Sequence, residues 1–168
     1  LVPEISLTAQ TVGRFRSRFG EQVAVLHSKL SLGERFDQWD LIRQGRARVV
    51  VGARSALFAP IQNPGLYIID EEHEASYKQD SLPRYHAREV AAQMARLRGA
   101  ALVLGSATPS LESLYRTAQG SWRDTNWTRV AMTERPGVAV LPQVQVVDMA
   151  SQFKNGGRSV FSSALALA

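Results

Sequence analysis

The amino-acid sequence predicts an open α/β fold in which a mostly parallel sheet carries helices on both faces. Three observations predict it: short apolar runs recur along the chain, helical patterns of about ten residues separate them, and glycines follow those helices. Strands of this kind are covered on both faces, and right-handed crossovers connect them. In such sheets, functional residues gather at the carboxyl ends of the strands.

The first predicted helix follows a polar start and ends at Gly20. Its apolar residues Val12, Phe15 and Phe19 recur at helical spacing, and the glycine after them allows a left-handed stop. Residues 22–26 follow as a short strand.

The second predicted helix begins with a capping box. Ser31 and Glu34 have the S-x-x-E spacing in which each side chain bonds the backbone N–H of the other residue, and Gly45 follows the last turn. We interpret Phe36 and Trp39 as core residues of this helix. The next segment, residues 48–51, is predicted to be a buried strand.

The middle of the chain predicts two further strands and two further helices. The strands are continuous apolar runs, and each helix stops at a glycine. The predicted strands are residues 66–69 and 101–104, and the predicted helices are residues 88–98 and 111–118.

The pattern weakens after residue 120. We therefore expect residues 1–120 to form the α/β lobe and residues 121–168 to form its end and a linker. The predicted features of this part are strands at 129–132 and 143–147, turns at Pro136-Gly137 and Pro142, a linker at Asn155-Gly156-Gly157, and a helix capped by Ser162.

Composition excludes several classes of protein. Hydrophobic residues make up 45% of the chain and charged residues 21%, which excludes a disordered or low-complexity chain. The absence of cysteine excludes a disulfide framework, a thiol nucleophile and any cysteine zinc site in these residues, and no apolar run could span a membrane. The net charge of +5, carried mostly by arginine, favours a polyanionic partner.

Two carboxylates stand where the apolar run 66–69 ends. Mg²⁺ requires a carboxylate that the sheet holds rigidly, and a neighbouring glutamate can then orient and deprotonate an attacking water. We therefore interpret Asp70 as the metal ligand and Glu71 as the base. The alternative is a solvated acidic turn after a core strand.

A loop of small and hydroxyl residues, Gly105, Ser106 and Thr108, follows the next apolar run. If the two strands are neighbours, this loop lies beside Asp70 and can sense a γ-phosphate, and His73 is placed to bridge the acidic turn to it. The alternatives are a plain helix entry capped by Ser110 and an ordinary surface histidine.

These motifs resemble a known family. Asp70-Glu71-Glu72-His73 with Ser106-Ala107-Thr108 is similar to motifs II and III of superfamily 2 helicases of the DEAH/DExH type, and in particular to its replication-restart members. The resemblance covers nearly the whole chain. Its stretches in this part of the chain are residues 1–8, 26–28 with 30–31 and 34–35, 52–60, 76–79, 84–88 and 105–113.

The resemblance implies the first RecA-like lobe of a P-loop ATPase, within an ATP-dependent 3′–5′ DNA helicase of the bacterial cytoplasm, associated with the nucleoid, that unwinds stalled forks and loads the primosome. Implied cofactors are ATP and Mg²⁺, with zinc only in a second-lobe insertion. Implied partners are single-stranded and forked DNA, primosome proteins and single-strand-binding proteins, without a membrane. No G-x-x-x-x-G-K-[ST] loop occurs here, so we expect a lobe incomplete at its N-terminus and inactive alone.

Two groups of residues are predicted to meet DNA. Aromatic rings and cations after the acidic turn suit stacking with single strands, and the family resemblance implies a loop that couples DNA to hydrolysis; an ordinary surface loop is the alternative. Groups at inferred strand ends can hold a DNA backbone or simply cap helices. The first group is Tyr77, Lys78, Arg84, Tyr85 and His86, and the second is Pro3, Ser6, His27, Ser28, Arg54 and Ser55.

Two functions of other classes compete with the helicase hypothesis. One is a metal-dependent nuclease built on Asp70, Glu71, His73 and His86. The other is a DNA-binding module without catalysis, whose binding would not respond to Glu71→Gln.

Overall fold

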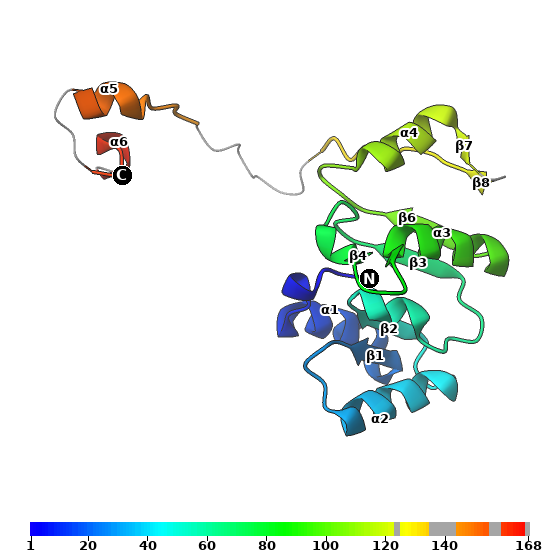
Figure 1. Ribbon diagram of the computed structural model, residues 1–168. Coiled ribbons are helices and arrows are strands. Elements are labelled where there is room, and N and C mark those ends of the chain that lie inside the picture. Colours follow the sequence, from blue (N-terminus) through cyan, green and yellow to red (C-terminus); the bar gives the residue numbers. More distant parts are fainter. Residues whose placement is uncertain (123–124, 135–143, 155–158, 167–168) are drawn as a thin grey trace. The chain divides into compact units, whose positions relative to one another are not determined.

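The computed structural model describes residues 1–122, 125–134, 144–154 and 159–166, which fall into two compact units, Leu1–Arg129 and Val130–Ala168 (Figure 1). The larger unit has the predicted α/β architecture, with parallel strands connected through helices. Within the described ranges, no helix has the length and apolar character needed to cross a membrane.

Two parallel ladders form the centre of the larger unit. Strands β1 (Val23–Leu26) and β2 (Val49–Gly52) pair with each other, as do β3 (Leu66–Ile69) and β6 (Ala101–Leu104). All four strands match the predicted segments to within a residue or two. Two antiparallel pairs of short strands are added to them: β4 (Lys78–Gln79) with β5 (Tyr85–His86), and β7 (Ser121–Trp122) with β8 (Thr125–Asn126).

The first two residues lie between the ladders. The Val2 N–H donates to the Gly52 carbonyl at the end of β2, and the Asp70 N–H after β3 donates to the Leu1 carbonyl, both at 3.0 Å. Each residue therefore bonds to one ladder, as a strand residue does, and the ends of β2 and β3 are held in one layer.

The helices end within a residue of their predicted ends, and α1 already begins within the polar segment 6–11 that precedes its apolar residues. Ser31 and Glu34 form the capping box, with the Ser31 N–H donating to Glu34 Oε2 at 2.9 Å. The predicted glycine stops all have positive φ. The helices are α1 (Ala9–Phe19), α2 (Leu32–Arg43), α3 (Ala87–Arg98) and α4 (Leu111–Gln119), and the short 3₁₀ turns are η1 (Glu4–Ser6), η2 (Gly20–Gln22), η3 (Arg54–Phe58) and η4 (Ala75–Tyr77).

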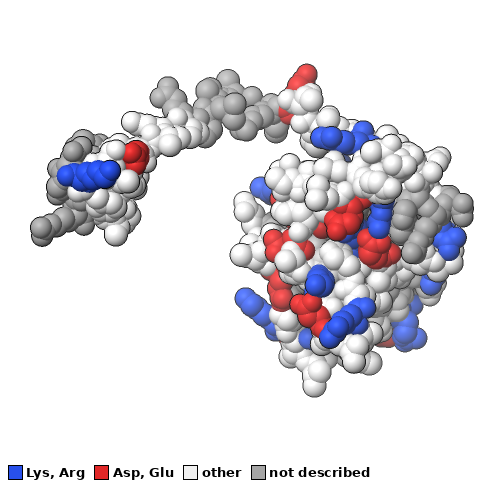
Figure 2. Space-filling model, turned by 45° about the horizontal axis from the view of Figure 1, so that its top comes forward, with Lys and Arg blue, Asp and Glu red and all other residues white. Residues whose placement is uncertain are grey.

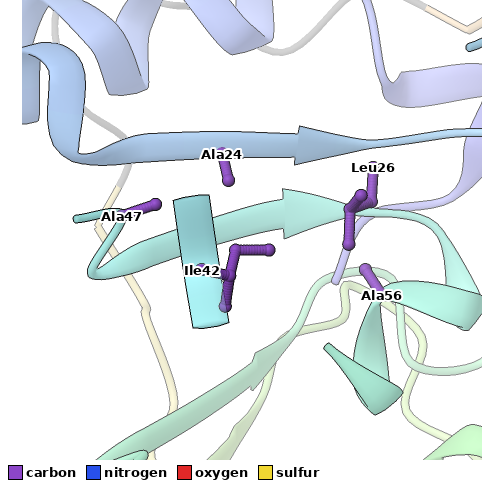
Figure 3. Close-up of a cluster of buried hydrophobic side chains, with 5 residues drawn as sticks. All are labelled: Ala24, Leu26, Ile42, Ala47 and Ala56. Carbon is purple, nitrogen blue, oxygen red and sulfur yellow. The ribbon is translucent and has the colours of Figure 1, made fainter. Parts of the chain in front are cut away.

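Helices α1 and α2 cover opposite faces of the β1–β2 ladder. Side chains alternate along a strand, so Val23 and Val25 pack toward Val12 and Phe15 of α1. The intervening residues Ala24 and Leu26 face α2, where Ile42 is fully buried among small side chains (Figure 3).

The interpretation of Phe36 and Trp39 as core residues is wrong. Phe36 is 69% exposed and Trp39 is 40% exposed. The apolar residues of α2 lie around the whole helix, and the face against the sheet carries Leu41, Ile42 and Gln38, whose side-chain oxygen accepts from the Val25 N–H at 2.8 Å. Helical periodicity therefore could not identify the buried face.

The expectation that every strand is covered on both faces is also wrong for the β3–β6 ladder. Helix α3 packs on the face that carries Ile69, through Ala87 and Ala91. On the opposite face, Leu66, Ile68 and Val103 are each about half exposed. A continuous apolar run predicts burial, but it does not say which element supplies the cover.

The predicted strands of the C-terminal part are not present in the residues described there. Residues 129–132 and 144–147 belong to no ladder, and a strand needs a partner for its backbone N–H and C=O groups. The smaller unit instead contains α5 (Met149–Lys154) and α6 (Ser163–Ala166), and Ser162 caps α6 as predicted, accepting from the Leu165 N–H at 3.1 Å. Residue 143, the predicted turns at Pro136-Gly137 and Pro142, and the linker at Asn155-Gly156-Gly157 lie outside the described residues.

Candidate functional site

The acidic turn and the serine–threonine loop lie side by side, as the sequence predicts for neighbouring strands. The parallel pairing of β3 with β6 brings their carboxyl ends together. The Gly105 N–H donates to the Ile69 carbonyl at 2.8 Å, and the Glu72 N–H donates back to the Gly105 carbonyl at 3.0 Å. Backbone bonds therefore join the two segments.

Asp70 is the first of the two predicted catalytic carboxylates at this junction. Asp70 is exposed, and its Oδ1 accepts from the Glu71 N–H at 3.1 Å. A side chain at position 105 would lie 3.5 Å from Asp70 Oδ1, so glycine leaves this carboxylate open on that side. One exposed carboxylate at a strand end fits a divalent cation that keeps most of its waters.

Glu71 has an unusual backbone conformation. Its φ is 47°, and among the described residues it is the one non-glycine residue with positive φ. Side chains disfavour this left-handed region, and such residues persist only where their surroundings hold them.

His73 connects the turn to the loop. Its Nδ1 lies 2.7 Å from Ser106 Oγ, which is the contact that the sequence analysis anticipated, and 3.6 Å from Glu71 Oε2. Ser106 Oγ also accepts from the Thr108 N–H at 3.0 Å. The loop hydroxyl and the acidic turn therefore share one hydrogen-bond network.

A buried ion pair behind this network is absent from the sequence predictions. Glu72 is 1% exposed; its carboxylate accepts from Arg88 Nη1 at 2.6 Å and from the Ser110 N–H at 2.6 Å. Ser110 Oγ lies 3.0 Å from the same carboxylate. The only sequence signal was the capping role assigned to Ser110, which it fulfils by accepting from the Ser113 N–H at 3.3 Å.

The pair of Glu72 and Arg88 belongs to a larger network of acidic and basic side chains. Burial alone would raise the pKa of Glu72, but the hydrogen bonds from Ser110 and Arg88 outweigh it and hold the pKa below its usual range. Arg88 also contacts Glu89, which Arg116 binds through both carboxylate oxygens, at 2.8 and 2.7 Å. The network thus joins α3 to α4.

The aromatic and basic loop after the turn is divided between core and surface. Tyr77 is 1% exposed, and its hydroxyl donates to the Asp70 carbonyl at 2.8 Å, so its ring is too deeply buried to stack with a base. Burial and the surrounding carboxylates raise the pKa of Tyr77. Lys78 and Arg84 are exposed, and Tyr85 is partly exposed.

Arg54 binds this loop to the end of β2. Its guanidinium donates to the Ser76 carbonyl at 3.1 Å, and also to the Lys78 carbonyl and the Gln79 side chain. It lies 5.8 Å from the centre of the Tyr85 ring, which packs edge-on against Phe58. Arg54 therefore positions the loop from within the protein.

A groove of about 460 Å³ runs across the carboxyl ends of β1 and β2. It brings together six of the predicted DNA-contacting residues, which are His27, Ser28, Arg54, Ser55, Tyr77 and Tyr85. Arg35 and Trp39 of α2, which were not among the predicted DNA contacts, line it as well. Figure 2 shows basic and acidic side chains intermixed on one face of the larger unit.

The remaining predicted contacts lie outside this groove or serve the fold. Pro3 is buried, and the Ser6 carbonyl accepts from Thr11 Oγ1 at 3.0 Å at the start of α1. His86 caps α3, because its Nδ1 accepts from the Arg88 N–H at 3.3 Å. Arg84 donates to the Asp80 carbonyl within its own loop.

The nuclease alternative requires a cluster of metal ligands. In the described part of the chain, no three histidine, aspartate or glutamate side chains gather closely enough to hold a metal ion. His86 is engaged as the cap of α3 rather than directed at the acidic turn.

Comparison with known proteins identifies relatives along almost the whole chain. A family model described as DEAD/DEAH box helicase matches residues 1–117. Replication restart protein PriA of Bacillus subtilis is 53% identical over 162 residues, which are 96% of this chain and 20% of that relative. The PriA proteins of Synechocystis (51% identical; 98% of this chain, 20% of the relative) and Treponema pallidum (46% identical; 90% and 22%) are similar. The chain spans about a fifth of the length of these curated relatives.

Proposed function

This chain belongs to the DEAD/DEAH box helicase family, and from that premise we propose that it forms part of the first RecA-like motor lobe of an ATP-dependent DNA helicase of replication restart. The observation that carries the proposal is the junction of Asp70 and Glu71 with the Gly105–Ser106 loop at two neighbouring strand ends. The carboxyl ends of the strands are where open α/β sheets hold their ligand-binding and catalytic residues.

Each residue at the junction has a proposed role in hydrolysis. Asp70 holds the divalent cation, for which Mg²⁺ is the proposed ion, and Glu71 orients and deprotonates the attacking water. Bound Mg²⁺ would supply charge neutralisation at the phosphates of ATP. His73 and Ser106, joined at 2.7 Å, respond together to the γ-phosphate, with Gly105 and Thr108 shaping the same loop.

Single-stranded DNA is the proposed ligand of the groove. Its lining combines side chains that can donate hydrogen bonds to phosphates, such as Arg35 and Ser55, with the partly exposed rings of Trp39 and Tyr85. Cations that follow a backbone and rings on which bases stack are what sequence-tolerant binding of single strands requires. Tyr77 lines the groove and also bonds the Asp70 carbonyl. A single buried side chain therefore separates the proposed DNA site from the acidic turn.

The wider role is proposed by extension from relatives that are named replication restart proteins. We propose that the complete protein acts at stalled forks with 3′–5′ polarity, that primosome and single-strand-binding proteins are its partners, and that it works at the bacterial nucleoid. Zinc belongs, in this proposal, to a segment other than these cysteine-free residues. Residues 1–120 are then the motor lobe and residues 121–168 lead toward a second lobe.

A chimera tests the hydrolytic role of Glu71. In it, this chain replaces the matching 162 residues of the Bacillus subtilis relative. Glu71→Gln keeps the size and polarity of the side chain but removes the base, so we expect ATP binding to be retained and kcat to fall at least about 100-fold. ATP binding and DNA-stimulated phosphate release are the measurements.

Glu74→Gln is the matched control, because it neutralises another carboxylate of the same turn and should leave kcat near that of the parent chimera. Near-normal kcat in the Glu71→Gln chimera would contradict the assigned base. DNA binding without any nucleotide hydrolysis by the parent chimera would favour the non-catalytic module.

A further inference from the structure

Glu71 occupies a backbone conformation that something must maintain. At φ 47° its own side chain disfavours the geometry, and the turn is otherwise exposed at Asp70 and His73. The next residue, Glu72, is by contrast the most firmly held residue of the turn, with its N–H on Gly105 and its carboxylate on Ser110 and Arg88.

We propose that Glu72 is a positioning residue, anchored by Arg88 and Ser110, that holds Glu71 in its left-handed conformation. Glu72 is only 1% exposed, so it does not reach a substrate at the surface. Its bonds reach the start of α3 and the start of α4, which are two elements fixed independently of the turn. Rotation of the Glu71 backbone toward an ordinary conformation would have to displace Glu72 from all three partners.

Physical chemistry favours this role over a purely stabilising one. Replacing a buried ion pair by apolar side chains of similar size is often neutral or stabilising, so such a pair is weak support for stability. Here the Glu72 carboxylate also accepts from the Ser110 backbone N–H at 2.6 Å. This bond fixes the direction of the Glu72 side chain as well as its distance from its partners. The hydrolytic consequence rests on the proposed function, whereas the conformational one does not.

The first test uses the 168-residue chain itself. In the double variant Glu72→Met with Arg88→Met, we expect the Glu71 ¹³Cβ shift to leave the left-handed range and the Glu72 amide to exchange at least about tenfold faster. Glu72→Gln keeps the volume and one acceptor oxygen of the side chain. It should therefore change the Glu71 shift and the Glu72 exchange rate in the same direction but by less. It also provides the measurement if the double variant does not fold.

Glu112→Gln is the matched control, because Glu112 meets the same arginine at 3.7 Å but is largely exposed. This variant should change neither the shift nor the exchange rate. If Glu71 kept its shift and Glu72 its protection in folded Glu72 variants, the anchor would be refuted.

The second test places the same variants in the chimera. A positioning role predicts a kcat lowered at least about tenfold with the KM for ATP within about threefold, because the base is misplaced while the nucleotide contacts remain. Unchanged kcat with a relaxed Glu71 would overturn the hydrolytic role. A parent chimera that does not hydrolyse ATP would contradict the proposed function instead, and the exchange experiment would still decide the anchor.

Discussion

At the scale of single residues, Gly52 shows how closely the ends of β1 and β2 pack against η3. It ends β2, and a Cβ atom there would lie 2.3 Å from the Leu26 carbonyl oxygen and 2.6 Å from the Ala56 Cβ. Figure 3 shows Leu26 pointing toward Ala56 at this place. Backbone atoms cannot retreat as a flexible side chain can, so a methyl group must push the strand ends apart.

We therefore predict that Gly52→Ala destabilises the chain by about 1 to 3 kcal/mol, the usual cost of overpacking. Gly33→Ala is the control: it lies in α2 with nothing within 4 Å of the added methyl group, and alanine favours a helix. Urea unfolding of both variants measures the difference. Equal stability of Gly52→Ala and the parent would show that the ends of β1 and β2 can accommodate a methyl group without cost.

The ionisation of His86 is a second effect at this scale. Burial and the positive charge of Arg88 lower the pKa of the His86 imidazole, whose neutral form accepts the bond that caps α3. A group with a lowered pKa in the folded state contributes stability above its unfolded pKa of about 6.5 and loses it as pH falls through the folded value.

His86→Asn should remove part of this pH dependence, because asparagine caps a helix without titrating. Between about pH 7.5 and pH 5, we expect the parent to lose more free energy of unfolding than His86→Asn does, by about 0.5 to 2 kcal/mol, the range of a capping bond. His27→Asn controls for the loss of a histidine that caps no helix. Parallel pH profiles of parent and His86→Asn would refute the role of this cap.

At the scale of elements, the β4–β5 hairpin is the connection between the groove and the acidic turn. Tyr77 precedes the hairpin and bonds the Asp70 carbonyl, and Arg54 hydrogen-bonds both residues of β4. If DNA binds beside Tyr85 as proposed, these contacts give it a short, packed path to the turn.

We predict that the double change Tyr85→Ala with Lys78→Ala in the chimera lowers DNA-stimulated ATPase far more than DNA affinity, which should fall by about 1 to 3 kcal/mol at most. ATPase rates at saturating single-stranded DNA and a binding isotherm in the same salt separate the two effects. Leu82→Ala, an exposed apolar change in the same loop, is the control. A loss of affinity that accounts for the whole loss of rate would leave the hairpin without a coupling role.

The elements also show what the sequence could and could not predict. Residues 66–69 and 101–104 were predicted with their observed bounds, because apolar runs between turn residues are unambiguous. The His73–Ser106 contact followed from placing these strands side by side. Glu72 escaped prediction because an acidic residue among four gives no sign of burial, and its partner Arg88 comes from another element. Trp39 escaped because α2 has apolar residues on every side.

At the scale of the whole molecule, the chain holds only some of the groups that hydrolysis needs. In the proposed function it supplies a cation ligand and a base, but it contains no glycine-rich loop with a lysine for the phosphates. We predict that the 168-residue chain releases phosphate from ATP at background rate, with or without single-stranded DNA. Phosphate release in parallel with the parent chimera is the measurement. Turnover by the purified chain that disappears in Glu71→Gln would prove this expectation wrong.

We expect the half-exposed apolar face of the β3–β6 ladder to affect how the isolated chain behaves in solution. Leu66, Ile68 and Val103 form a contiguous exposed apolar surface, which favours self-association. The net charge of +5 opposes it by mutual repulsion between molecules, but only while that repulsion is unscreened. The chain should therefore stay dispersed in dilute buffer and aggregate as ionic strength rises, which is the reverse of salting-in.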